Sequence, residues 1–187
     1  MGRSVDTGTW SNVRAMATCA ECRFDWELSA EDACAVIGGF GEAYRARLAR
    51  FANAPNSALV RERPAPEVWS ALEYAAHVRD VITFYAERIG RVLNEERPHL
   101  TPADFSSMPE RRGYLDDDPS DVLDAISDSS TSVEQELRRL TPEQWTRIGI
   151  GTDGDERTTL VLARRLAHDG HHHILDLDRI AEAVLAN

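Results

Sequence analysis

The feature that most constrains the fold is the spacing of apolar residues between Leu162 and Val184. They recur at steps of three and four, which predicts one continuous face of an α-helix. The residues on this face are Leu162, Leu166, Gly170, His173, Leu177, Ile180 and Val184. A histidine within such a line is either a satisfied core residue or a ligand.

Two carboxylates accompany that histidine along the predicted helix. Asp169 precedes His173 by four residues, and Asp176 follows it by three. Side chains at these spacings lie one above another on a helix, so the imidazole and both carboxylates converge. Buried charges persist only when they are paired or bound to a metal. The sequence therefore predicts a metal site on this helix.

The same periodicity predicts three earlier helices, each preceded by a residue suited to the N-cap position. They run from Ser29 to about Ala52, from Ser70 to about Asn94, and from Asp118 to about Leu140. Long connections separate the first three helices. We therefore expect an all-α fold, a four-helix bundle with long crossover connections, over residues 29–187. Residues 1–28 are expected to form an N-terminal arm.

Three places weaken this pattern. Glycines at 38, 39 and 41 weaken the middle of the first helix and indicate a close helix contact or a bend. The serine-rich run at residues 127–132 makes the centre of the third helix its weakest part. The glycines between Arg147 and Arg157 predict a small hairpin or a loop.

The composition excludes some classes of partner. A net charge of −11 argues against nucleic-acid binding, which needs a positive surface. No apolar run approaches the roughly 18 residues of a membrane span. The first twelve residues lack the apolar core of a secretory signal, so we expect a cytoplasmic protein.

The expected arm carries Cys19 and Cys22 in a CxxC pattern. Three cysteines in the whole chain argue against a disulfide scaffold. A structural zinc site normally needs four ligands, which Cys34 and distant histidines could complete only if the chain folds back. Three interpretations stay open: an inert half-knuckle, a zinc knuckle shared across a homodimer, and a redox pair.

A second histidine also points inward. His77 lies on the predicted helix from Ser70 to Asn94, and it shares the edge of the apolar face with Val81 and Phe84. His99 lies beside Pro98 in a loop, where we expect no role for it.

Two segments resemble the DinB-like family. The run WSALEYAAHVRD, residues 69–80, resembles the family segment WSxLEYxxHxRD, and HDGHHHILD, residues 168–176, is similar to the closing motif HExxHHxxD. The Cys19 to Phe24 element and the Asp118-Pro119 pair match one actinobacterial branch. The resemblance spans about residues 19–178.

This resemblance implies a bundle with a divalent metal, held by one histidine on the second helix and two residues on the fourth. Some members are thiol S-transferases or isomerases that use mycothiol, bacillithiol or glutathione, and many have no known activity. The sequence departs from the family at Asp169, where Glu is usual, and at Leu115, where Asn is common.

Two registers of the fourth helix fit the family motif. One takes His168 and His172 as ligands, and the other takes Asp169 and His173. His168 and His172 share their row with Arg164, Arg165 and Arg179, which predicts a solvated face. We therefore prefer Asp169 and His173, with His77 as the third ligand.

Two imidazoles and one carboxylate leave coordination positions open, which is typical of catalytic metal sites. Zinc is favoured, while nickel, iron(II) and manganese also suit these ligands. Asp80 and Asp176 are placed to orient the imidazoles from outside the ligand set. The alternative for Asp80 is a surface carboxylate paired with an arginine.

The expected function is a metal-dependent thiol S-transferase or isomerase acting on a small electrophile. Mycothiol is favoured because the chain has no lysine and resembles actinobacterial proteins. One alternative is a metal-binding or stress-associated protein without turnover. Another takes the CxxC as a redox or zinc-sensing element on a helical scaffold.

Overall fold

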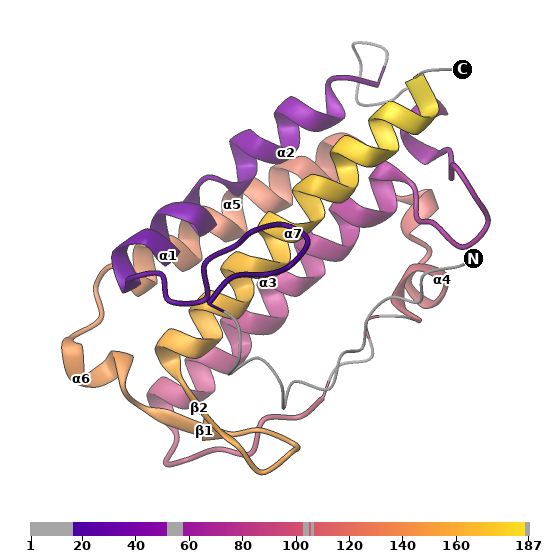
Figure 1. Ribbon diagram of the computed structural model, residues 1–187. Coiled ribbons are helices and arrows are strands. Elements are labelled where there is room, and N and C mark those ends of the chain that lie inside the picture. The colour runs from indigo at the N-terminus through magenta and orange to yellow at the C-terminus, as the bar shows by residue number, and fades with distance from the viewer. Residues whose placement is uncertain (1–16, 52–57, 103–104, 106, 186–187) are drawn as a thin grey trace.

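Four amphipathic helices pack around one apolar core, and the first of them is interrupted at Gly39 (Figure 1). The computed structural model describes residues 17–51, 58–102, 105 and 107–185. The bundle is built from α1 (Ala30–Gly38) with α2 (Phe40–Leu48), α3 (Ala71–Asn94), α5 (Pro119–Leu137) and α7 (Thr159–Leu185). The smaller elements are η2 (Ala58–Arg61), α4 (Met108–Arg112), η3 (Tyr114–Asp116), α6 (Pro142–Trp145), β1 (Ile148–Ile150) and β2 (Glu156–Thr158). The predicted four-helix bundle is confirmed.

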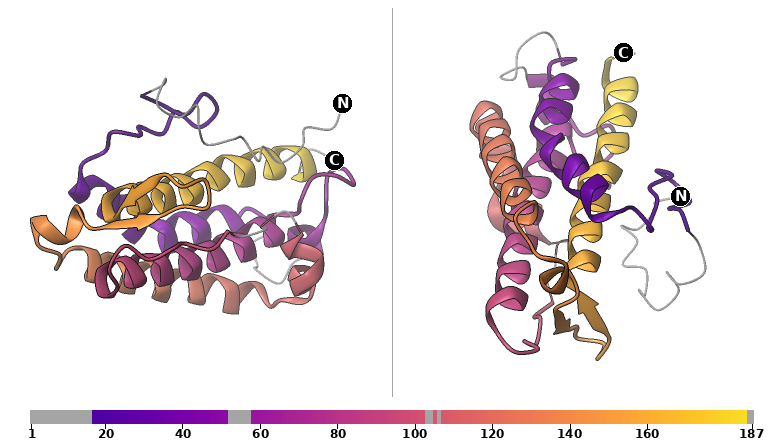
Figure 2. Two further views of the ribbon diagram at one scale, coloured as in Figure 1. Left: turned by 90° about the horizontal axis from the view of Figure 1, so that it is seen from below. Right: turned by 90° about the vertical axis from the view of Figure 1, so that its left-hand side faces the viewer.

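Helix α7 lies between α3 on one side and the α1–α2 pair on the other, and α5 closes the bundle opposite it (Figures 1 and 2). Helices α3 and α5 run in the same direction. The connection between them therefore returns along the bundle, from β1 at one end to α4 and η3 at the other. This is the crossover that the long second connection predicted.

The helix starts follow the predicted caps. The Ser29 hydroxyl accepts a hydrogen bond from the Asp32 N–H, which caps α1. Ser70 and Glu73 form a reciprocal capping box at the start of α3. The Asp118 carboxylate caps α5. Each cap satisfies backbone donors that the first helical turn leaves unpaired, and so fixes where the helix begins.

The first helix differs from its prediction, because it breaks at Gly39 and α2 ends at Leu48. The predicted end, Ala52, lies outside the described residues. A Cβ at Gly41 would lie 2.9 Å from the Ser127 Cα, so α2 approaches α5 more closely than any larger residue allows. The small residues on both helices therefore serve one close contact, and the serine-rich centre of α5 is helical throughout.

The segment after α6 is a hairpin, as the glycine pattern allowed. Strands β1 and β2 pair antiparallel, with Gly149 opposite Arg157. Strand β2 leads directly into α7, whose first turn is capped by the Thr158 hydroxyl. No helix in the described part of the chain is long and apolar enough to cross a membrane.

Candidate metal centres on helix α7

The bundle interior brings together the two histidines that the sequence singled out. His77 on α3 and His173 on α7 face each other with ring centroids 4.8 Å apart and rings nearly perpendicular. The His77 residue is 5% exposed. The His173 side chain is 16% exposed and so remains reachable from solvent. We refer to these two residues as the interior pair.

A carboxylate orients one member of the interior pair. The His173 Nδ1 lies 2.9 Å from the Asp176 Oδ2, one turn further along α7. With its proton on Nδ1, His173 donates to Asp176 and presents Nε2 as a free ligand atom. Burial raises the pKa of Asp176, but the hydrogen bond from His173 and the nearby His173, His172 and Arg179 charges together lower it below its usual value. Asp176 therefore lies where it can orient His173, and its part in a metal site stays a prediction.

The other member, His77, has an unsatisfied nitrogen. Its Nδ1 is buried and has no hydrogen-bond partner in the described part of the chain. Burial, followed by the nearby His173, holds the pKa of His77 well below its usual value. The neutral imidazole is the form that binds a metal. Without a metal, the buried Nδ1 that lacks a hydrogen-bond partner costs folding free energy.

Aromatic rings surround the interior pair. Trp69 and Phe105 pack on His77 with ring centroids 5.3 and 5.2 Å away. Tyr74 packs on His173 at 5.3 Å. These rings exclude water around the imidazoles and strengthen electrostatic interactions there.

The predicted third ligand, Asp169, points toward a neighbouring histidine. Its Oδ1 lies 3.3 Å from the His168 Nδ1. Burial raises the pKa of Tyr85 on α3, and the charge of the nearby Asp169 raises it further. In the described chain, Asp169, His77 and His173 do not gather within 4.8 Å of one another. The structure thus pairs the two imidazoles, and ligation by Asp169 stays a prediction.

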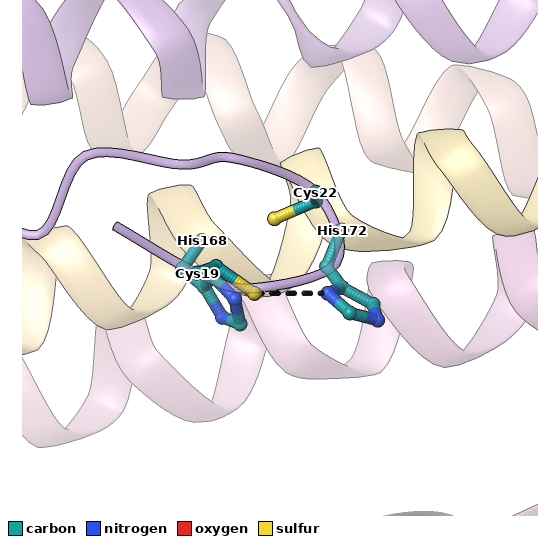
Figure 3. Close-up of side chains that lie close together, drawn as sticks. All are labelled: Cys19, Cys22, His168 and His172. Atoms are coloured by element: carbon teal, nitrogen blue, oxygen red, sulfur yellow. Dashed lines mark hydrogen bonds between the residues drawn. The ribbon is translucent and has the colours of Figure 1, made fainter. Parts of the chain in front are cut away.

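A second group lies on the other side of α7. Cys19, Cys22, His168 and His172 each offer one ligand atom, and these four atoms all lie within 4.8 Å of one another. Figure 3 shows both thiols beside the two imidazoles, with the Cys19 Sγ 3.9 Å from the His172 Nδ1. We refer to these four residues as the arm cluster.

A tight turn presents both thiols of the arm cluster to α7. Thr18 and Asp25 form an isolated antiparallel bridge, and the Cys19 N–H donates to the Phe24 carbonyl at 2.8 Å. Arg23 adopts the left-handed region, with φ of 62°, which lets the chain reverse directly after Cys22. The chain does fold back onto α7, which the sequence left as one route to a complete zinc site.

The sequence predicted a solvated face for His168 and His172, and this prediction is wrong. Their side chains are 12% and 22% exposed, because the arm covers them. Trp26 packs on His168 at a centroid distance of 4.3 Å, and the Arg164 guanidinium donates to the Leu28 carbonyl. The nearest sequence signal was the pair of aromatic residues, Phe24 and Trp26, just after the CxxC.

The prediction that Asp80 orients an imidazole also needs correction. Asp80 accepts hydrogen bonds from Arg79 and from the Tyr114 hydroxyl, both at 2.9 Å, instead of orienting an imidazole. The arginine pairing weighed as the alternative is therefore present, although the Asp80 side chain is 9% exposed and not on the open surface. Its role is to fasten η3 to α3.

Neighbouring groups shift the pKa values of two residues in the arm cluster. Burial alone would lower the pKa of His168, but Asp169 and the two cysteines raise it to about 10. Burial alone would raise the pKa of Cys19, but backbone N–H groups of Cys22 and Glu21 and the His168 side chain lower it overall. Both shifts reflect how closely the His168 imidazole, the thiols and the Asp169 carboxylate approach one another.

Comparisons with known proteins agree with this architecture. Residues 41–176 match the family described as the DinB superfamily. The fold is similar to that of YfiT from Bacillus subtilis, with a TM-score of 0.69 and 21% sequence identity, covering 80% of this chain and 86% of that one. YfiT is described as a probable metal-dependent hydrolase with an unusual four-helix bundle topology. No curated protein matches the sequence.

Proposed function

Since the chain belongs to the DinB superfamily, we propose that it is a metal-dependent enzyme whose reaction centre is the interior pair. His77, His173 and Asp169 would hold the metal, and Asp176 would orient His173. The observation that carries the proposal is the buried, unpaired Nδ1 of His77 facing a second imidazole that a carboxylate already orients.

We propose a thiol S-transferase or isomerase that combines a low-molecular-weight thiol, with mycothiol favoured, and a small electrophile. A bound divalent metal, with zinc favoured, would supply Lewis acidity that stabilises the thiolate near neutral pH. The support for a thiol is the resemblance of residues 69–80 and 168–176 to family members that use one. The support for a metal is the geometry of the interior pair.

The protein side chains around the pair would set the reaction environment. Trp69, Tyr74 and Phe105 keep water from the imidazoles. Partial exposure of His173 leaves a route for a small substrate, while the buried His77 anchors the metal from α3. Asp176 keeps the His173 ring from rotating, so the free nitrogen stays directed at the site.

A metal-dependent hydrolase is the second candidate, and the description of YfiT favours it. The same ligands would serve it, because a Lewis acid activates water as well as a thiol. A binding protein without turnover is the remaining alternative. A homodimer stays a prediction that sedimentation or size-exclusion measurement can test.

Thiol consumption separates these candidates. The zinc-loaded protein is incubated with a chlorodinitrobenzene electrophile and with mycothiol, bacillithiol, glutathione or no thiol. The thiolate sulfur bonds to the ring carbon and chloride leaves, which gives a coloured thioether. We expect thioether to form fastest with mycothiol, and His77→Ala to lose that rate at least 100-fold.

The matched control is His99→Ala, which removes an exposed loop imidazole and should retain the rate. Cleavage of a nitrophenyl ester without thiol, lost in His77→Ala, would favour the hydrolase instead. Equal rates for the wild type and His77→Ala with every substrate would contradict the proposed enzyme.

A further inference from the structure

The arm cluster differs from the interior pair in its ligands and in its place in the chain. Two of its ligands are sulfurs from residues 19 and 22, and two are imidazoles one helical turn apart on α7. A Cys2His2 set with four protein ligands leaves no coordination position open. Its chemistry is therefore that of a structural zinc site.

The spacing of the four atoms suits a tetrahedral ion. Zinc bonds of about 2.3 Å to sulfur and about 2.0–2.1 Å to nitrogen place neighbouring ligands roughly 3.3–3.8 Å apart. In the structure all four ligand atoms lie within 4.8 Å, and the Cys19 Sγ is 3.9 Å from the His172 Nδ1. Closure onto zinc needs shifts of only about 1 Å.

Each imidazole in the cluster has a carboxylate on its far nitrogen. His168 has its Nδ1 3.3 Å from Asp169, and its Nε2 is buried without a hydrogen-bond partner in the described part of the chain. In His172 the two nitrogens have the opposite roles. Its Nδ1 faces the Cys19 sulfur, and its Nε2 lies 3.9 Å from the Glu21 Oε2. A metal-binding histidine usually has such a partner on its other nitrogen, which fixes the tautomer.

Packing and a few hydrogen bonds, among them the bond from the Arg164 guanidinium to the Leu28 carbonyl, hold the arm against α7. Between residues 17 and 28 the arm contains a single isolated bridge and no regular helix or strand. Its apolar contribution to α7 comes mainly from Phe24 and Trp26. A bound metal ion would add a cross-link between this segment and α7.

We propose that Cys19, Cys22, His168 and His172 bind a structural zinc ion that fastens residues 17–28 of the arm to α7. This site is separate from the interior pair, and its assignment does not rest on the proposed enzymatic function. Asp169 contacts His168, so the zinc also fixes the carboxylate that the interior site is predicted to use.

Cobalt substitution tests this assignment. Cobalt(II) bound to thiolates in a tetrahedral site gives a sulfur-to-metal charge-transfer band and intense visible bands. Absorption spectra are recorded for the wild type, Cys19→Ser with Cys22→Ser, His172→Ala, His172→Cys and His77→Ala. Cys34→Ala is the matched cysteine control, because Cys34 is buried outside the cluster.

We expect the charge-transfer band in the wild type, His77→Ala and Cys34→Ala. The double serine variant and His172→Ala should lose this band. They should bind cobalt at the arm cluster at least 100-fold more weakly, with helical circular dichroism retained. His172→Cys should restore binding, since cysteine is also a zinc ligand.

Two results would overturn the proposal. The first is a wild-type cobalt spectrum without the charge-transfer band. The second is isolation of the protein under reducing conditions with Cys19 and Cys22 joined as a disulfide, which would assign them to redox chemistry. Failure of the thiol assay would leave the cobalt result unchanged, so the two proposals fail separately.

Discussion

The two sides of α7 present the same spacing of ligands to two different surroundings. His173 lies toward α3, among aromatic rings, whereas His168 and His172 lie under the arm, beside two thiols. His172 and His173 are adjacent in sequence, with ring centroids 5.7 Å apart and rings 84° to each other. One step along a helix turns the side chain by about 100°, so neighbouring residues serve different sites.

This comparison shows why the family motif alone could not select a register. Both pairs have the i, i+4 spacing that a helix-borne metal site needs. The difference is set by what covers each face. On the interior side, the proposed oxygen and nitrogen ligands would leave coordination positions open. On the arm side, the two thiols would complete a closed set. Asp169 borders both sides through its contact with His168.

The largest effect should come from removing one imidazole on each side. His168→Ala should abolish metal binding at the arm cluster, and His173→Ala should abolish it at the interior pair, each by more than about 100-fold. Each variant should leave the other site within about 10-fold. Competitive titration with a chromophoric chelator measures both affinities. Loss of both sites in either single variant would show that the comparison is false.

The second prediction alters the packing of α7 without changing a ligand. A Cβ at Gly170 would lie 2.2 Å from the buried Phe40 ring, so Gly170→Ala should destabilise the fold by about 1–3 kcal/mol. Gly90 on α3 is the control, because a Cβ there meets nothing within 4 Å. Gly90→Ala should stabilise by up to about 1 kcal/mol. Urea unfolding measures both, and a neutral Gly170→Ala would refute the packing argument.

The third prediction concerns the carboxylate beside His173. Asp176→Asn should weaken metal binding at the interior pair by about 10–100-fold, because the side chain no longer holds the Nδ1 proton firmly. The arm cluster should keep its affinity. Asp178→Asn is the matched control, since Asp178 pairs with Arg50 at the surface of the same helix. Equal metal affinity in the two variants would remove Asp176 from the site.

The smallest effect should come from Glu21 at the edge of the arm cluster. Its carboxylate is half exposed, 3.9 Å from the His172 Nε2 and 3.4 Å from the Arg179 guanidinium. Because solvent screens such pairs, Glu21→Gln should weaken arm binding of zinc by less than about 1 kcal/mol. A loss of 100-fold or more would mean that Glu21 is itself a ligand.

Local sequence signals predicted the bundle and the interior pair well. The caps at Ser29, Ser70 and Asp118 begin helices where the sequence indicated. The apolar lines face the core, and His77 and His173 meet there. These features depend on periodicity and on contacts within a few residues, which sequence patterns encode directly.

The arm cluster depended on contacts that no local pattern contains. The thiols at residues 19 and 22 reach histidines about 150 positions later because a short turn packs Phe24 and Trp26 against α7. Without that contact, the arginines near His168 and His172 indicated solvent. Asp80 was misjudged for a similar reason, since Tyr114 approaches it from the crossover connection.

The number of metal ions per chain tests the central claim most directly. Native mass spectrometry of zinc-loaded protein, purified without an affinity tag, should show two ions in the wild type. Cys19→Ser with Cys22→Ser should retain one ion, His77→Ala with His173→Ala should retain one, and the combined variant none. A single ion in the wild type, lost in both partial variants, would contradict two separate sites on α7.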